Sequence, residues 1–230
     1  MTDTAPQPMT IDIYSDVMCP WCLIGYGQLQ KALNELDSEI DVQLRWRPFE
    51  LNPDMPQQGE EQEAHLQRKY GRSAEEGAAV RGQMKSIADS AGVSLSYQGE
   101  AEDAPPAMMW NTRKAHKLLT FALDEAGPKV QTELKLALFK AHFNERKNVS
   151  DETVLLDIAA GVGIHREAAK SALLDDELEA RVVSEERQAW DLNISGVPAM
   201  IVNGKFMIPG AQAPETYVNA LRRVAEKSAA

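Results

Sequence analysis

Strand-like sequence occurs only near the two ends of this 230-residue chain, and this division constrains the fold more than any other feature. Near the N-terminus, Met9 to Ser15 alternates apolar and polar residues, Pro20 to Leu36 has leucines at helical spacing, and Val42 to Trp46 alternates again. Strand, helix and strand follow one another within about forty residues, which is the size of one βαβ unit. This pattern predicts two parallel strands joined by a right-handed crossover.

β character returns near the C-terminus. Asp175 to Asp191 predicts a helix, Pro198 to Val202 an apolar strand, and Lys205 to Ile208 its hairpin partner across the turn Asn203-Gly204. Pro214 to Glu226 predicts a final amphipathic helix. The two ends together therefore predict the order βαβ followed by αββα.

The sequence between the two ends is helix-forming, with almost no alternation. The expected helices are Glu60 to Tyr70, Ala74 to Ala91, Pro106 to Ala126, Pro128 to Phe143, Asp151 to Ala160 and Arg166 to Leu174. We therefore predict an α/β chain in which an all-helical insertion domain, residues 56–175, separates the two parts of a β-containing domain, residues 9–55 and 176–230.

Charge and composition exclude several classes of function. The chain is 43% hydrophobic, which is enough for a sizeable core, and its 24 Lys and Arg against 35 Asp and Glu give a net charge of −11. This field repels nucleic acid, and no cluster of basic residues offsets it. No segment approaches the roughly 18 apolar residues of a membrane span, and residues 1–8 lack the pattern of a secretion signal. We expect a cytoplasmic protein with no membrane or nucleic-acid partner.

The two cysteines lie together in Cys19-Pro20-Trp21-Cys22, where the first strand meets the first helix. A helix N-terminus presents unpaired N–H groups and the positive end of a dipole, which favour a thiolate. We expect Cys19 to be an exposed nucleophile with a lowered pKa. Cys22, one turn later, is expected to be buried and to resolve a mixed disulfide on Cys19.

Half of a zinc site and an inert pair of thiols are the alternatives for these cysteines. Zinc needs four ligands, commonly from a second closely spaced pair. The four histidines, however, are scattered singly along the chain, as His65, His116, His142 and His165. Because reduced cysteine pairs in cytosolic proteins are more often catalytic or metal-binding than structural, the sequence favours a redox pair and predicts no metal site.

Three phrases in this sequence resemble the thioredoxin superfamily, and specifically the FrnE-type subgroup of its DsbA-like branch. They are Asp12 to Cys22, Trp46 to Pro53 and Ser195 to Pro198, and they occur in the order found in that family. The resemblance implies a thioredoxin fold interrupted by a helical domain and a protein-disulfide oxidoreductase activity. It also implies a cis peptide bond before Pro198, packed against Cys19, where an isolated Val-Pro would be expected to be trans. The backbone of Val197 would then pair with an extended substrate.

The resemblance also implies roles for individual residues. Cys19 corresponds to the attacking cysteine, Cys22 to the resolving cysteine and Pro198 to the cis-proline. Substrate-binding positions would be Trp21, Val197, Phe49, Asn52, Asn111 and His116. For His116, an ordinary histidine on a helix face is an equal alternative. No tightly bound cofactor is implied, glutathione is a candidate co-substrate, and the partner would be a protein or small molecule bearing a thiol or disulfide.

The sequence departs from the family pattern at two positions. Ile13 occupies the position, six residues before the nucleophile, where many thioredoxin-like proteins bury a carboxylate as a proton relay. We expect any relay to be rearranged, with Asp16 and Asp12 as the nearby acids, or to be carried by water. Trp21 supplies no positive charge between the cysteines, so the potential should fall between about −120 mV for DsbA and about −270 mV for thioredoxin.

Two other functions compete with the oxidoreductase. One is a glutathione-dependent isomerase or transferase of the 2-hydroxychromene-2-carboxylate isomerase-like subgroup, acting on aromatic small molecules. Those relatives typically have serine at the position of Cys19, which disfavours this interpretation. The other is a non-enzymatic, chaperone-like binding protein that uses a cleft in the helical insertion.

Overall fold

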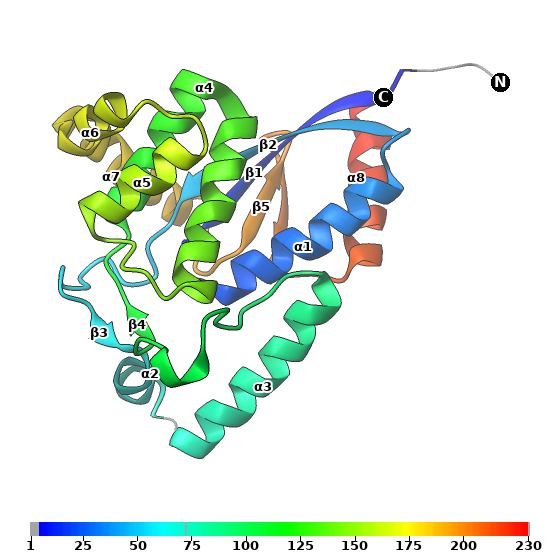
Figure 1. The fold of residues 1–230 in the computed structure, drawn as a ribbon. Coiled ribbons are helices and arrows are strands. Elements are labelled where there is room, and N and C mark those ends of the chain that lie inside the picture. Colours follow the sequence, from blue (N-terminus) through cyan, green and yellow to red (C-terminus); the bar gives the residue numbers. More distant parts are fainter. Residues whose placement is uncertain (1–4, 72, 230) are drawn as a thin grey trace.

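The structure is a computed structural model that describes residues 5–71 and 73–229. Two predictions extend beyond these residues: the expected absence of a secretion signal rests partly on residues 1–4, and the predicted C-terminal part of the β-containing domain includes residue 230. Within the described residues the chain forms the predicted α/β fold, with one four-stranded sheet and helices packed around it (Figure 1).

The sheet combines strands from both ends of the chain. Its members are β1 (Gln7–Ser15), β2 (Ile40–Pro48), β5 (Ala199–Val202) and β6 (Phe206–Pro209), in the spatial order β2-β1-β5-β6. β1 and β2 are parallel, whereas β5 is antiparallel to both β1 and β6. Ile13 lies opposite Trp46 on one side and Met200 on the other. The segment that follows β1, which carries the cysteines, therefore starts from the middle of the sheet.

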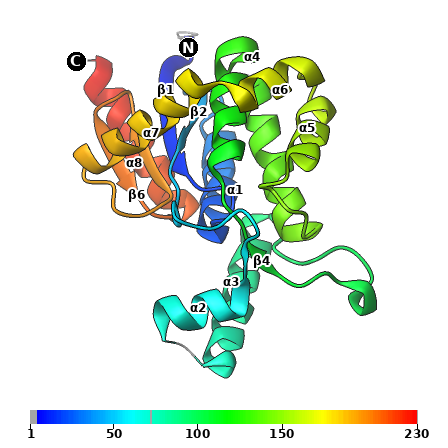
Figure 2. The same cartoon turned by 90° about the vertical axis from the view of Figure 1, so that its left-hand side faces the viewer.

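Helices account for most of the remaining chain. They are α1 (Pro20–Glu35), α2 (Gln62–Tyr70), α3 (Ala74–Ala91), α4 (Arg113–Phe139), α5 (Glu152–Gly161), α6 (Arg166–Leu174), α7 (Asp176–Asp191) and α8 (Pro214–Ala229). Helices α2 and α3 extend away from the sheet, and α4, α5 and α6 lie beside it (Figure 2). No helix of the described residues is long and apolar enough to cross a membrane.

Alternation along β1 separates the two faces of the sheet. Ile11 and Ile13 belong to the core that α1 and α8 complete, which we call the sheet core. Tyr14 instead packs with Ala189 of α7 on the opposite face. Successive side chains of a strand point to opposite faces, so α1 and α8 cover one face and α7 covers the other.

Helix α4 is a helical hairpin. Gly127 adopts φ 82° and ψ 178°, which is not helical, and Pro128 starts the second half. The halves lie side by side (Figure 1), and Gln131 Nε2 in the second half donates to the carbonyl of Leu119 in the first at 3.1 Å. The sequence predicts this break at Gly127-Pro128. It places the start of the first half too early, because residues 106–112 are not helical and include the strand β4 (Met108–Met109).

β4 pairs antiparallel with β3 (Glu60–Glu61), so the segment between the two β-bearing ends contains one short strand pair in addition to its helices. Each strand has only two residues. Periodicity needs at least four residues to become visible, and for that reason the sequence does not indicate this pairing.

The cysteine motif lies where two cores meet. Val17 and Met18 belong to the core formed mainly by α4, α5 and α6, which we call the helical core. Cys19 and Cys22 belong to the sheet core, to which Phe139 at the end of α4 also contributes. The second half of α4 therefore contacts the segment around the cysteines.

Candidate active site

Cys19 is the N-cap residue of α1 and Cys22 lies in the first turn of that helix. Cys19 has an extended conformation (φ −85°, ψ 111°), Pro20 follows as the first helical residue, and no acidic residue lies in the first turn. Proline is well suited to this position because the N–H it lacks would have no helical partner. The positive end of the helix dipole is therefore directed at the cysteines without a neighbouring carboxylate in that turn. Both thiols are free.

Cys19 is buried, which corrects the expectation that it is exposed. Only 3% of the residue is accessible, and Cys22 is fully buried. Cys19 Sγ donates a hydrogen bond to the carbonyl oxygen of Val197 at 3.6 Å, so the loop before β5 covers the sulfur. Trp21, between the two cysteines, is 39% exposed. The surface of the site therefore consists of Trp21 and the Val197 loop rather than the sulfur itself.

The peptide bond between Val197 and Pro198 is cis, as the family resemblance implies. The proline ring packs directly on α1, because its Cγ lies 3.0 Å from the position that a Cβ on Gly25 would take. The carbonyl of Pro198 accepts a hydrogen bond from Gly210 N at 2.8 Å. These contacts fix the loop against both the helix that carries the cysteines and the end of β6.

The two thiols interact and titrate as a pair. The pKa of Cys19 is raised, first by its hydrogen bond to Cys22 and then by burial. Burial also opposes ionisation of Cys22, but the hydrogen bonds from Cys19 and Ser15 and the positive charge of Lys135 more than offset it, so the pKa of Cys22 is lowered. The expected order of the two pKa values is therefore reversed in the reduced protein: the pKa of Cys22 is lowered and that of Cys19 is raised.

Asp16 is the acid that lies beneath the cysteine segment. It is fully buried and accepts hydrogen bonds from the backbone N–H groups of Met18 at 3.3 Å and Leu51 at 2.8 Å. Its Oδ1 lies 3.8 Å from Nε2 of His116. Burial opposes ionisation of Asp16, but the interaction with His116, the N–H of Leu51 and the charge of Lys135 together outweigh it and lower the pKa. Asp12, the other acid considered, instead pairs with Arg45 and Arg47, each at 2.7 Å.

Lys135 is a site residue that the sequence analysis missed. It is fully buried in the second half of α4, and its Nζ donates to the carbonyl of Ser15 at 3.3 Å. The same Nζ lies 5.3 Å from the ring centroid of Trp46 and 5.0 Å from that of Phe139. Burial lowers its pKa to about 8, although the negative charges of Cys22 and Asp16 act in the opposite direction. A signal was present, because Lys135 lies four residues before Phe139 on the apolar face of its helix.

The residues expected to bind substrate lie at different places in the structure. Phe49 is buried, with its ring 5.8 Å from that of Trp190 on α7. Asn52 accepts a hydrogen bond from Lys69 Nζ at 2.8 Å. Asn111 donates to the carbonyl of Met55 at 3.0 Å and accepts from Arg113 N at 3.1 Å, so it connects two loops. His116 is buried against Asp16. Of this set, Trp21 and Val197 are the residues at the surface beside Cys19.

A second buried charge cluster, also missed, joins the end of β2, the start of α4 and α7. Arg113 Nε donates to Glu50 Oε2 at 2.9 Å, and Arg113 Nη2 lies 3.5 Å from Glu186 Oε2. Burial and the negative charge of Glu50 raise the pKa of Glu186 to about 8. Glu186 is therefore mostly protonated at neutral pH, and Arg113 balances the single charge of Glu50.

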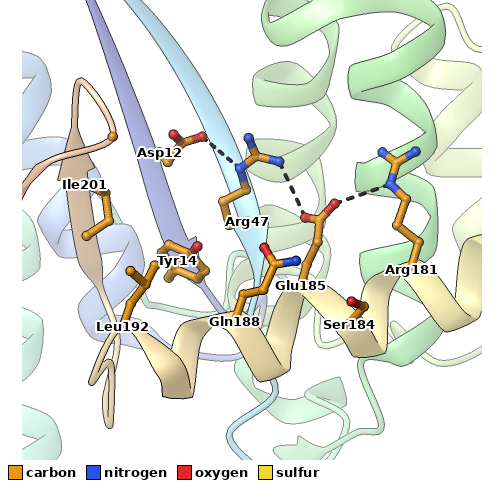
Figure 3. Close-up of a pocket in the computed structure, with 10 residues that line it drawn as sticks. Asp12, Tyr14, Arg47, Arg181, Ser184, Glu185, Gln188, Leu192 and Ile201 are labelled. Carbon is orange, nitrogen blue, oxygen red and sulfur yellow. Dashed lines mark hydrogen bonds and ion pairs between the residues drawn. The ribbon is translucent and has the colours of Figure 1, made fainter.

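A cavity of about 320 Å³ lies on the α7 face of the sheet, away from the cysteines. Figure 3 shows Asp12, Arg47, Glu185 and Arg181 linked in one row of ion pairs along it. Because these charges already neutralise one another, we assign no ligand to this cavity. Among the described residues, no group of three or more His, Cys, Asp or Glu side chains is arranged to hold a metal ion.

Comparison with known proteins agrees with this architecture. A DsbA oxidoreductase from Streptomyces coelicolor, described as probable, is 28% identical, has a TM-score of 0.82, and aligns over 94% of this chain and 89% of its own. Two further structures, each 17% identical, share the fold. A 2-hydroxychromene-2-carboxylate isomerase has a TM-score of 0.66, covering 96% of this chain and 98% of its own. The cytosolic disulfide reductase DsbM from Pseudomonas aeruginosa, determined with GSH, has a TM-score of 0.62, covering 94% and 99%.

The family assignment rests on most of the sequence. Residues 10–222 match the DSBA-like thioredoxin domain, a range that runs from the first strand of the sheet into the last helix. The fold, the cysteine pair at the start of α1 and the cis-proline loop beside it lie within this range. The chain therefore belongs to the family of DsbA-like thioredoxin domain proteins.

Proposed function

We propose that this protein is a thiol–disulfide oxidoreductase that uses Cys19 and Cys22 as its redox pair. One observation carries the proposal: two free thiols interact at the N-terminus of α1, and the loop carrying Val197 covers one of them. Membership of the DsbA-like family supports it. Cys19 is the nucleophile because it lies next to the surface, whereas Cys22 is fully enclosed and resolves the intermediate.

In the reducing direction, a proton first passes from Cys19 to Cys22, which places the thiolate on Cys19. That thiolate attacks one sulfur of the substrate disulfide, the S–S bond breaks, and the leaving thiolate takes a proton from water. The Cys22 thiol then loses its proton and attacks the Cys19 sulfur, which releases the second substrate thiol and leaves a Cys19–Cys22 disulfide. Two electrons pass from the dithiol to the substrate. Oxidation of a substrate dithiol is the reverse sequence.

The carbonyl of Val197 connects this chemistry to substrate binding. In the reduced protein it accepts the hydrogen bond of the Cys19 thiol. Once Cys19 is bonded to a substrate sulfur, that S–H no longer exists and the carbonyl is free to accept a backbone N–H from an extended substrate. In the oxidising direction, release of the substrate re-forms the Cys19 thiol, which then donates to this carbonyl in place of the substrate N–H. Trp21 supplies exposed apolar surface beside this contact.

The remaining expectations complete the proposal. Residues 56–175 form a helical insertion domain, the location is cytoplasmic, and no cofactor is tightly bound. Glutathione is the proposed co-substrate, a choice supported by the shared fold of DsbM, whose structure was determined with GSH. The other partners are proteins or small molecules that bear thiols or disulfides.

Serine variants of each cysteine test this function. Cys19→Ser should abolish both insulin-disulfide reduction and dithiol oxidation, because no nucleophile remains. Cys22→Ser should accumulate mixed disulfides between Cys19 and substrate or glutathione, visible by mass spectrometry without reductant. Full activity in the Cys19→Ser protein would contradict the proposal. The potential, measured against glutathione, should lie between about −120 and about −270 mV.

The same variants separate the two competing functions. A glutathione-dependent isomerase or transferase acting on aromatic molecules would keep its activity in Cys22→Ser, because glutathione supplies its thiol. A chaperone-like protein would suppress aggregation equally well with both cysteines replaced by serine. If the unaltered protein also exchanged no disulfides, either result would favour the corresponding function over the oxidoreductase.

A further inference from the structure

The starting observation is a buried ammonium group that no carboxylate neutralises directly. Lys135 is fully buried, and its Nζ donates to the carbonyl of Ser15. Among the described residues, no carboxylate oxygen lies within 4 Å of it, whereas Lys117, also buried in α4, lies 3.3 Å from Glu179 Oε2. An uncompensated buried charge is costly. The ammonium of Lys135 lies at Ser15, in the segment that leads into the cysteines.

The groups around Lys135 show which negative charge its ammonium can stabilise. The segment after β1 offers the thiols of Cys22 and Cys19 and the carboxylate of Asp16, all of which interact electrostatically with Lys135. β2 contributes the ring of Trp46, and α4 itself contributes Phe139, both at cation–π distance. Asp16 is already held by His116 and by two backbone N–H groups. The charge that remains without an opposite partner is the thiolate of the cysteine pair.

Ser15 links Lys135 to Cys22 through its carbonyl group and its side chain. Its carbonyl accepts a hydrogen bond from Lys135 Nζ at 3.3 Å, and its side chain helps to lower the pKa of the Cys22 thiol. Lys135 is fully buried, whereas the contact between Val197 and Cys19 lies next to the surface. The lysine can therefore act on the buried sulfur without touching a substrate.

We propose that Lys135, supplied by the helical hairpin, is the buried cation that stabilises the thiolate of Cys22 and thereby favours the reduced dithiol. Lys135 acts as a positioning residue through Cys22, and the proposal rests on the redox function proposed above. Ile13, six residues before Cys19, carries no charge. The buried charged group that contacts the cysteine segment is instead Lys135 of α4, and it is positive. A buried carboxylate would disfavour a thiolate at this place, whereas a lysine favours it.

The step balances without a new reactant. Ionisation of the Cys22 thiol sends its proton to water or to the departing substrate thiolate, and the ammonium of Lys135 keeps its own proton. Formation of the Cys19–Cys22 disulfide removes the negative charge, so the ammonium becomes less favourable. By linkage, the pKa of Lys135 must be lower in the disulfide form than in the dithiol form.

The experiment compares Lys135→Met with Lys117→Met. Both remove a fully buried ammonium from α4, but Lys117 Nζ contacts Leu173 O and Glu179, not the cysteine segment. Thiolate absorbance at 240 nm against pH gives the thiol pKa, and equilibration with glutathione above that pKa gives the redox equilibrium. Lys135→Met should raise the first thiol pKa by about one unit. It should also shift the equilibrium about tenfold toward the disulfide, about 30 mV for two electrons. Lys117→Met should change neither, and Lys135→Arg should restore both.

An unchanged thiol pKa in folded Lys135→Met protein would overturn the proposal. A second measurement uses the unaltered chain: an NMR titration of the lysine side chains in the dithiol and disulfide forms. One buried lysine should titrate at lower pH in the disulfide form, and identical titrations would equally overturn the proposal. Failure of the oxidoreductase function would be distinct, because the unaltered protein would then exchange no disulfides whatever its thiol pKa.

Discussion

Val197 and Cys19, far apart in the sequence, meet through a hydrogen bond from Sγ to the carbonyl oxygen at 3.6 Å. The contact depends on a close approach between the Pro198 ring and α1, which the absence of a side chain on Gly25 permits. The position of the loop over the sulfur is thus set by the packing of a neighbouring helix. This relationship leads to the first prediction.

Gly25→Ala should weaken both stability and disulfide exchange. The added Cβ would lie 3.0 Å from Pro198 Cγ and 3.4 Å from Ala211 Cβ, so the loop that contacts Cys19 must yield to make room. Overpacking of this kind costs about 1–3 kcal/mol. The matched control is Gly82→Ala in α3, where the new Cβ meets nothing within 4 Å, and helix propensity predicts a gain of up to about 1 kcal/mol. Urea denaturation and insulin reduction measure the two effects, and equal behaviour of the variants would refute this packing argument.

Trp21→Ala should impair substrate binding with little effect on folding. Trp21 is 39% exposed beside Cys19, and substitutions at such surface positions usually change stability by less than about 0.5 kcal/mol. We expect KM for a protein disulfide to rise several-fold with a smaller change in kcat. Trp190→Ala is the control, because the ring of Trp190 on α7 packs against the buried ring of Phe49 at 5.8 Å. That control should lower the melting temperature and leave KM unchanged.

Asp16→Asn should destabilise the protein and change its response to acid. Asp16 accepts two backbone N–H groups and faces His116, and leaving a buried donor unsatisfied costs about 1–3 kcal/mol. The pKa of Asp16 is lowered from 3.8, so its ionised form stabilises the fold above about pH 4. That contribution is lost as the pH falls through the folded-state pKa. Denaturation at several pH values should therefore show a flatter acid limb in the variant, and an unchanged limb would contradict the assignment.

Glu186→Gln should remove a loss of stability between about pH 5 and pH 8. The pKa of Glu186 is raised from 4.5 to about 8, so in this range the folded chain holds a proton that the unfolded chain has released. The free energy of unfolding must then fall as the pH rises across this window. Glutamine mimics the protonated acid and should flatten the curve, whereas Glu226→Gln, at an exposed position of α8, should leave the slope as it is. Chemical denaturation across this range checks both variants.

The spacing of apolar residues predicted most of the architecture, because the core-facing residues of each strand or helix recur at a regular interval along the chain. The alternation of Ile11 and Ile13 and the Asn203-Gly204 turn correspond to β1 and to the β5–β6 hairpin. Gly127-Pro128 marks the reversal within α4. The cysteine pair was likewise evident from its position between a strand and a helix. These features are local, so the sequence carries them directly.

The features that could not be predicted from the sequence depend on contacts between segments far apart in the chain. Cys19, the more N-terminal sulfur, was expected to be exposed, but a loop from the other end of the chain covers it. The place of Lys135 on the apolar face of α4 is visible in the sequence, but its contact with the Ser15 carbonyl depends on how α4 packs on the sheet. Phe49 was predicted to bind substrate, and its packing against Trp190 of α7 could not be foreseen from the sequence. Each outcome follows from tertiary packing rather than from local propensity.

The reversal at Gly127 has a geometric consequence for the charges behind the cysteines. In a straight helix, the Cα atoms of His116 and Lys135 would be about 28 Å apart at 1.5 Å per residue. The hairpin instead lets His116 reach Asp16 while Lys135 reaches Ser15, the adjacent residue. The turn at Gly127 therefore brings together the imidazole of His116 and the ammonium of Lys135, which would lie about five turns apart in a straight helix. The length and angle of this turn, although it lies far from either sulfur, determine which charges the redox pair encounters.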